Sequence, residues 1–137
     1  MVKKIPKTIE FRVEPYKCLV FAGTDKKALE QRIKAHIKKH GGKECKSREF
    51  HVHLPPLCEG GGAYTTELAD GVYAVLYGTL DPGFCAHEAV HLKNMIFSHI
   101  GQNPTHMSGS DETESYLVES LFNNMYLGLQ GKKPEGA

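Results

Sequence analysis

Two histidines and a glutamate on one predicted helix have the spacing of a hydrolytic metal site. His87, Glu88 and His91 form the pattern His-Glu-x-x-His. Histidines four residues apart project from one side of a helix, so both imidazoles can reach one metal ion. The glutamate beside the first histidine can hydrogen-bond a water on that metal and accept its proton. Zn²⁺ lowers the pKa of such a water to about 7, so a carboxylate can complete the deprotonation near neutral pH.

The helix that carries this pattern has well-marked ends. Asp81 and Pro82 are typical of a helix N-cap and first helical position, and the helical pattern ends at Ile100–Gly101. An apolar setting makes histidine and glutamate costly unless a metal uses them, so we expect a desolvated metal site. The alternative is an exposed helix on which the three polar side chains are solvated. The small or apolar neighbours that favour the first interpretation are Ala86, Ala89 and Val90.

A catalytic zinc needs a third protein ligand and one open position. The extended metzincin pattern would place Gly at position 94 and His at position 97, but the chain has Asn94 and Phe97, which excludes that class. The other common solution is a glutamate on a following helix. The sequence predicts such a helix from about Asp111 to Leu127–Gly128.

Two glutamates of this second helix compete for the role of third ligand. Glu114 lies at the centre of the apolar stripe by helical angle, but Asp111 and Glu114 also form a capping box, which is a structural arrangement. Glu112 is followed three residues later by the small Ser115, which allows the two helices to approach closely. The spacing alone leaves both glutamates open.

The metal-bearing segment resembles a known class of protein. The runs HEAVHLKNMIFSHIG and DETESYLV are similar to those of short His-Glu-x-x-His proteins of bacteriophage and prophage genomes. These resemble gluzincin-type zinc metallopeptidases of the thermolysin-like clan. The resemblance covers Tyr64 to about Met125 and implies that Glu112 is the third ligand, with Ser115 at a position usually occupied by Ala. The other matching residues are Asp70, Gly71, Val72, Tyr73, Tyr116 and Leu117.

The resemblance implies a zinc metallopeptidase that hydrolyses peptide bonds. One Zn²⁺ per chain would be held by His87, His91 and Glu112, and Glu88 would be the catalytic residue. The expected partners are a peptide or protein substrate and a phage or host protein, in the host cytoplasm or the virion. A zinc-stabilised phage assembly or virion component without catalysis is the alternative.

The predicted elements form an α+β fold. We expect one zincin-like domain over 1–130 and a flexible tail over 131–137, with a small, mostly antiparallel sheet, one N-terminal helix and two C-terminal helices. A peptide substrate is expected to pair with the strand that precedes the metal-bearing helix. The predicted strands are Thr8–Val13, Tyr16–Ala22, Glu49–Leu54, Ala63–Glu67 (an edge strand) and Gly71–Tyr77, and the N-terminal helix is Lys26–His40.

Composition excludes several classes of protein. The 137 residues are the size of one domain, and 17 basic against 16 acidic residues give a net charge of +1, which argues against nucleic-acid binding by the whole chain. No apolar run reaches the length of a membrane span, and no secretory signal is expected at the N-terminus. Four scattered cysteines are then expected to be reduced thiols. These are Cys18, Cys45, Cys58 and Cys85.

The helix over 26–40 carries a basic face that suggests a third class, a nucleic-acid-binding module. Lys27, Lys34 and Lys38 recur at helical spacing, but a solvated helix surface is the favoured interpretation.

Other candidate residues carry weaker hypotheses. A second metal site at His51 and His53, with Cys45 and Cys58, matches no zinc-finger spacing. His99 lies too far along the helix to share the zinc. Cys85 is expected to be buried and to point away from the ligands. His106 or Tyr116 could stabilise an oxyanion, although a loop or packing role is favoured for both.

Overall fold

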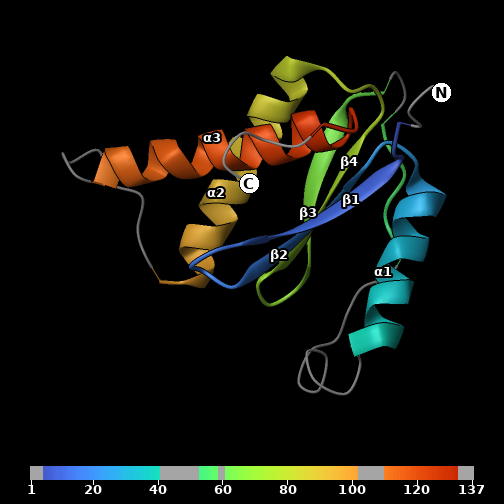
Figure 1. The fold of residues 1–137 in the computed structure, drawn as a ribbon, viewed down its shortest axis with the longest axis horizontal. Helices are drawn as coiled ribbons and strands as arrows, with labels where there is room; N and C mark the ends of the chain where they lie inside the picture. The colour runs from blue at the N-terminus through green and yellow to red at the C-terminus, as the bar shows by residue number, and fades with distance from the viewer. Residues whose placement is uncertain (1–4, 41–52, 59–60, 102–109, 133–137) are drawn as a thin grey trace.

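The computed structural model places four strands in one sheet with helices on both faces (Figure 1). It describes residues 5–40, 53–58, 61–101 and 110–132. The class is α+β, as predicted. The elements are β1 (Thr8–Val13), β2 (Cys18–Gly23), α1 (Lys26–His40), β3 (Ala63–Ala69), β4 (Val72–Tyr77), α2 (Pro82–His99) and α3 (Ser110–Gly128).

The sheet has the strand order β1-β2-β4-β3, and it is mixed rather than mostly antiparallel. The two outer pairs, β1 with β2 and β3 with β4, are antiparallel, but β2 and β4 are parallel. Parallel neighbours need a long crossover connection, and α1 lies in the segment between them. Our expectation of a mostly antiparallel sheet missed this long-range pairing.

Both central strands are buried on both faces. Val20 and Ala22 of β2 belong to the core beneath α2 and α3, whereas Leu19 and Phe21 belong to the core beneath α1. Figure 1 shows α1 on one side of the sheet and the crossing helices α2 and α3 on the other. A strand covered on both faces needs apolar residues at every position, which explains the continuous apolar sequence of β2 and β4.

Local signals fix the helix ends. The side chain of Asp25 accepts a hydrogen bond from the backbone N–H of Ala28 at 2.9 Å, and Asp81 accepts from Gly83 at 2.7 Å. Gly101 follows α2 with a φ of 76°, a left-handed conformation that suits glycine. The predicted bounds of α1, α2 and α3 are therefore confirmed within one residue.

Other predictions had mixed outcomes. The second strand begins at Cys18 rather than Tyr16, because Lys17 has a φ of 57° and interrupts the extended chain. Of the strand predicted over 49–54, residues 49–52 lie outside the described residues, and Leu54 is in no strand. Residues 133–137 of the predicted tail also lie outside them. Among the described residues, no helix is both long and apolar enough to cross a membrane.

Candidate metal centre

His87 and His91 lie next to each other on the exposed side of α2. Their Nε2 atoms are 3.1 Å apart, and their ring centroids are 4.7 Å apart. Two imidazoles on a tetrahedral zinc, each at 2.0–2.1 Å, have nitrogen atoms about 3.3 Å apart. The two Nε2 atoms therefore already have nearly the separation of two ligands of one zinc ion.

The same contact has a simpler interpretation as a hydrogen bond between the rings. One neutral imidazole would donate its Nε2–H to the Nε2 of the other. To bind a metal through both Nε2 atoms, each ring must carry its proton on Nδ1 instead. The separation of the two Nε2 atoms suits a shared metal ion. The hydrogen-bonded pair carries a proton on one Nε2 atom, whereas the metal-bound pair carries both protons on Nδ1.

Glu88 differs from its histidine neighbours in being buried, with 3% of its surface exposed. Its Oε1 accepts a hydrogen bond from the hydroxyl of Thr65 on β3 at 2.8 Å. Among the described residues Glu88 makes no second hydrogen bond, and no buried side-chain oxygen lacks a partner. The other carboxylate oxygen, Oε2, therefore retains contact with solvent.

The surroundings of the motif are only partly as predicted. Ala89 is buried, but Ala86 is exposed and 43% of Val90 is exposed. Ala86 and Val90 line a groove of about 470 Å³ between α2 and α3, together with Ser115. The expected desolvated setting is therefore found at Glu88 and not at the two histidines, which are exposed.

The third ligand predicted from the resemblance does not join the histidines. Glu114 is bonded to the buried Lys93 at 2.5 Å, which gives it a structural partner in the groove between the helices. Glu112 is exposed at the start of α3. Within the described ranges, no three His, Cys, Asp or Glu residues form a group that could hold a metal. The structure thus brings together the two histidines, whereas the carboxylate of Glu88 contacts Thr65 and Glu112 does not join the pair.

Helical geometry explains this separation. Successive residues of a helix are about 100° apart around its axis. The groove with α3 lies on the side of Ala86 and Val90, so His87 and His91 point about 100° away from it. A carboxylate of α3 must reach around α2 to meet the histidines.

Sequence analysis missed the partners of two candidate carboxylates: Thr65, which bonds Glu88, and Lys93, which bonds Glu114. Thr65 lies 23 residues before Glu88, and Lys93 lies 21 residues before Glu114. Both contacts join different elements, so no periodic pattern signals them. The burial of Lys93, which calls for a partner, is itself a result of the fold.

The remaining candidate residues lie elsewhere. His99 packs on Gly71, where a Cβ would come within 3.0 Å of its Nε2. Tyr116 lines a pocket with the β1–β2 turn, which neither histidine of the motif lines. Cys85 is buried as predicted, and burial raises the pKa of its thiol. His53 and Cys58 are exposed, whereas Cys45, His51 and His106 lie outside the described residues.

The strand expected to receive a peptide is a central one. The prediction that a substrate pairs with β4 is wrong, because β4 is hydrogen-bonded to β2 on one side and to β3 on the other. β3 is an edge strand, as predicted, and its Thr65 contacts Glu88 of α2. The free edge of β3 is therefore the one beside the candidate centre.

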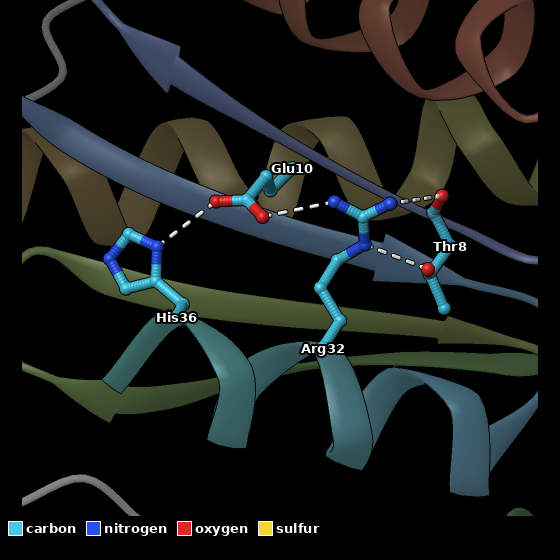
Figure 2. Close-up of polar contacts among 4 residues, drawn as sticks. All are labelled: Thr8, Glu10, Arg32 and His36. Carbon is cyan, nitrogen blue, oxygen red and sulfur yellow. Dashed lines mark hydrogen bonds and ion pairs between the residues drawn. The ribbon is translucent and has the colours of Figure 1, made fainter. Parts of the chain in front are cut away.

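A second histidine pair with the same spacing occurs on α1, and sequence analysis did not single it out. His36 is buried, its ring is 4.5 Å from that of His40, and its Nδ1 is 3.1 Å from Glu10 Oε2 (Figure 2). Arg32 donates to the other oxygen of Glu10 at 2.9 Å and to the Thr8 hydroxyl at 2.7 Å. These contacts join α1 to β1.

The basic face of α1 is exposed at Lys27, Lys34 and Lys38. None of the three makes an ion pair within the described part of the chain. Arg32, in contrast, is held by Glu10. The nucleic-acid hypothesis therefore depends on these lysines and not on the arginine.

Comparison of the chain with protein-family models, with curated proteins and with solved structures found no match.

Proposed function

We propose that the chain is a zinc-dependent metallopeptidase with a zincin-like centre. The 3.1 Å separation of the two Nε2 atoms, beside a buried glutamate with one oxygen open to solvent, is the observation that supports it. His87 and His91 would provide two zinc ligands. Glu88 would be the proton acceptor.

Glu112 is the proposed third ligand, on the basis of the resemblance. Glu114 is the poorer choice, because its carboxylate is already paired with Lys93. The exposed position of Glu112 means that zinc binding requires its side chain, or the first turn of α3, to move toward the histidines. Zinc binding at this centre is therefore expected to draw Glu112 toward the histidines.

When bound, zinc would supply a Lewis acid that acidifies water and polarises a peptide carbonyl. Glu88 would accept a proton from the attacking water through Oε2, while Thr65 holds Oε1. The same carboxyl group would then pass the proton to the leaving amine. A peptide in extended form would pair by its main chain with the free edge of β3.

The test of the proposed function is a Glu88→Gln variant. General acid–base catalysis contributes about 10²- to 10⁴-fold, so we expect the variant to bind one zinc per chain and to lose at least about 100-fold in hydrolysis. Zinc is measured by mass spectrometry of metal content, and hydrolysis by new termini in a peptide library made from a bacterial proteome. Glu119→Gln, an exposed glutamate on α3, is the matched control. Full hydrolysis by Glu88→Gln would overturn the assignment.

The incomplete ligand set favours one alternative, a zinc-stabilised protein without catalysis. Two histidines without a carboxylate are what the described residues assemble. This alternative predicts zinc bound by the wild-type protein, lost in His91→Ala, and no new termini in the peptide library. Zinc-dependent cleavage by the wild type would exclude it.

A further inference from the structure

We propose that the free edge of β1 is a self-association surface, at which a second copy of this chain adds its own β1 and continues the sheet. In the strand order β1-β2-β4-β3, β1 lies at the edge opposite β3. An edge strand presents backbone N–H and C=O groups to which a further strand can bond. The surface is separate from the candidate metal centre, which lies beside β3, and it does not depend on the proposed function.

The backbone of β1 turns alternate residues toward β2 and toward the open edge. The C=O of Lys7 accepts a hydrogen bond from the N–H of Thr24 at 2.9 Å, which continues the register of the β1–β2 pair. Residues two apart in an antiparallel strand turn their backbone groups the same way. Phe11 therefore faces β2 with its backbone, whereas Glu10 and Arg12 turn theirs toward the open edge.

Symmetry limits the ways in which two copies of β1 can pair. In a two-fold antiparallel dimer, each face of the extended sheet carries the same residues of both copies, so an even-numbered residue lies opposite an even-numbered one. An axis at Phe11 places Glu10 opposite Arg12 of the other copy, and the reverse. Each of these pairs exchanges two N–H···O bonds through outward backbone groups. The two Phe11 residues then form the pair at the axis that makes no backbone bond, with Cα atoms about 4.5 Å apart.

This register is the one that the charges of β1 favour. It sets a carboxylate directly across from a guanidinium at two positions, and opposite charges in such cross-strand pairs are stabilising. Glu10 is bonded to Arg32 (Figure 2), but 32% of its side chain stays exposed, and Arg12 is exposed. In β3, at the other edge, Glu67 is the one charged residue, so two copies of β3 could form no such pairs. The charge pattern therefore singles out β1 as the edge that complements itself.

The opposite face of β1 provides an apolar contact at the proposed axis. Phe11 is half-buried, packs against the core beneath α2 and α3, and lines a groove of about 270 Å³ between β1 and α3. The Phe11 ring of the other copy would lie beside this groove and pair with the first ring across the axis. Ile9 and Val13 share this face, and the register places each opposite the other between copies. The surface thus combines an apolar face with a face of paired charges.

One contact limits the length of this pairing. Arg32 donates to the outward C=O of Thr8 at 3.3 Å, so the intermolecular backbone bonds involve Glu10 and Arg12 and do not extend to Thr8. A short strand pair is at the small end of the range of protein interfaces. We therefore expect a reversible dimer with a dissociation constant on the order of 10 μM.

The first test is sedimentation velocity between about 1 μM and about 200 μM protein, concentrations on both sides of this constant. A chelator is present, so that the exposed histidines cannot join two copies through a metal. The wild type should change from monomer to dimer over this range. Arg12→Glu places carboxylates opposite each other and should raise the dissociation constant at least about 10-fold. Lys27→Glu makes the same change of charge on the exposed side of α1 and should match the wild type.

Two outcomes of this test would overturn the proposal. A wild type that stays monomeric throughout does not pair with itself, and the edge of β1 would then be left to a different protein. A dimer that Arg12→Glu leaves as strong as in the wild type uses another surface.

A mixture of two charge variants tests the register. Glu10→Arg sets arginines opposite each other, so alone it should associate as weakly as Arg12→Glu does. Mixed together, the two variants restore opposite charges in both pairs. We expect a heterodimer with an affinity within about threefold of that of the wild-type dimer. If both variants fold, as judged by circular dichroism, and the mixture does not associate, the proposed pairing is wrong.

Cysteine cross-linking gives an answer even if Glu10→Arg does not fold. Phe11→Cys places two thiols at the axis, where Cα atoms about 4.5 Å apart are within disulfide reach. In Arg12→Cys the two positions are diagonal, about 7–8 Å apart, and beyond that reach. Both variants carry Cys45→Ser and Cys58→Ser, because Cys58 is exposed and would cross-link by itself. With a mild oxidant, Phe11→Cys should give a covalent dimer and Arg12→Cys should not. Equal yields, or the reverse, would overturn the proposal.

Discussion

Two helices of this protein carry histidine pairs with identical spacing but different surroundings. On α1, His36 is buried, packs edge-on to Phe21 with ring centroids 5.3 Å apart, and lies 3.1 Å from a carboxylate oxygen of Glu10. On α2, His87 and His91 are exposed, and their Nε2 atoms contact each other at 3.1 Å. In the first pair His36 joins a helix to the sheet, whereas the Nε2 atoms of the second pair meet on an exposed side of α2.

This difference shows that an i, i+4 spacing does not by itself make a helical histidine metal site. The spacing brings both pairs of rings within 4.7 Å of each other. The two pairs differ in the orientation of their helix faces relative to the sheet. A face that packs against the sheet contacts other side chains, whereas a face turned to solvent remains accessible to a ligand. The role of each pair can be tested by the following measurements.

The largest expected effect is stabilisation by zinc. At a free zinc concentration 100-fold above its dissociation constant, a single site raises the free energy of unfolding by about 2.7 kcal/mol. We expect this gain in the wild type and in His40→Ala, and none in His91→Ala, as measured by urea unfolding with and without zinc. If zinc raises the free energy of unfolding of His91→Ala but not of His40→Ala, the metal binds on α1 instead.

The next effect concerns stability without metal. In the presence of a chelator, His36→Ala should lower the free energy of unfolding by about 2 kcal/mol, because it removes a buried ring and a partner of Glu10. His87→Ala should change it by less than about 0.5 kcal/mol, as expected for an exposed side chain. Equal losses in the two variants would contradict the structural difference between the pairs.

The smallest effect distinguishes a buried tyrosine from an exposed one through alkaline pH. Tyr77 is fully buried beneath α2 and α3, and burial, with smaller contributions from Cys85 and Glu88, raises the pKa of its phenol far above the ordinary value. An unfolded tyrosine ionises near pH 10, so the unfolded state loses this proton first and stability falls as the pH rises above 10. At pH 11 the loss from Tyr77 alone is about 1.4 kcal/mol.

Tyr77→Phe should therefore show a smaller drop in unfolding free energy between pH 9 and pH 11 than the wild type does. Tyr116→Phe changes a tyrosine with 64% of its surface exposed and should keep the full drop. An unchanged drop in Tyr77→Phe would show that ionisation of this buried phenol does not limit alkaline stability.

Much of the fold could be predicted because the signals that set it are local. A capping aspartate stands before α1 and before α2, and a glycine follows α2 in the left-handed conformation. Such signals act within four residues, so they can be identified without the rest of the chain. The parallel pairing of β2 with β4 could not be predicted in this way, because it joins strands separated by a helix and another strand.

The candidate centre was predictable only in part, for the same reason. His87, Glu88 and His91 lie within one helix, so helical geometry alone brings the two imidazoles together. The bond from Lys93 to Glu114 and the bond from Thr65 to Glu88 each join two elements, and no spacing predicts them. Glu112 was chosen by resemblance, and the fold leaves it apart from the histidines.

The sequence by itself determined where the helices begin and end and which pairs of histidines lie one turn apart, because these depend on neighbouring residues. Only the tertiary structure decided that His36 is buried and His87 exposed, that β3 and not β4 has a free edge, and that Glu114 is paired with Lys93. These outcomes depend on how each element packs against the sheet. That packing is set by the burial of two apolar cores whose members lie far apart in the chain.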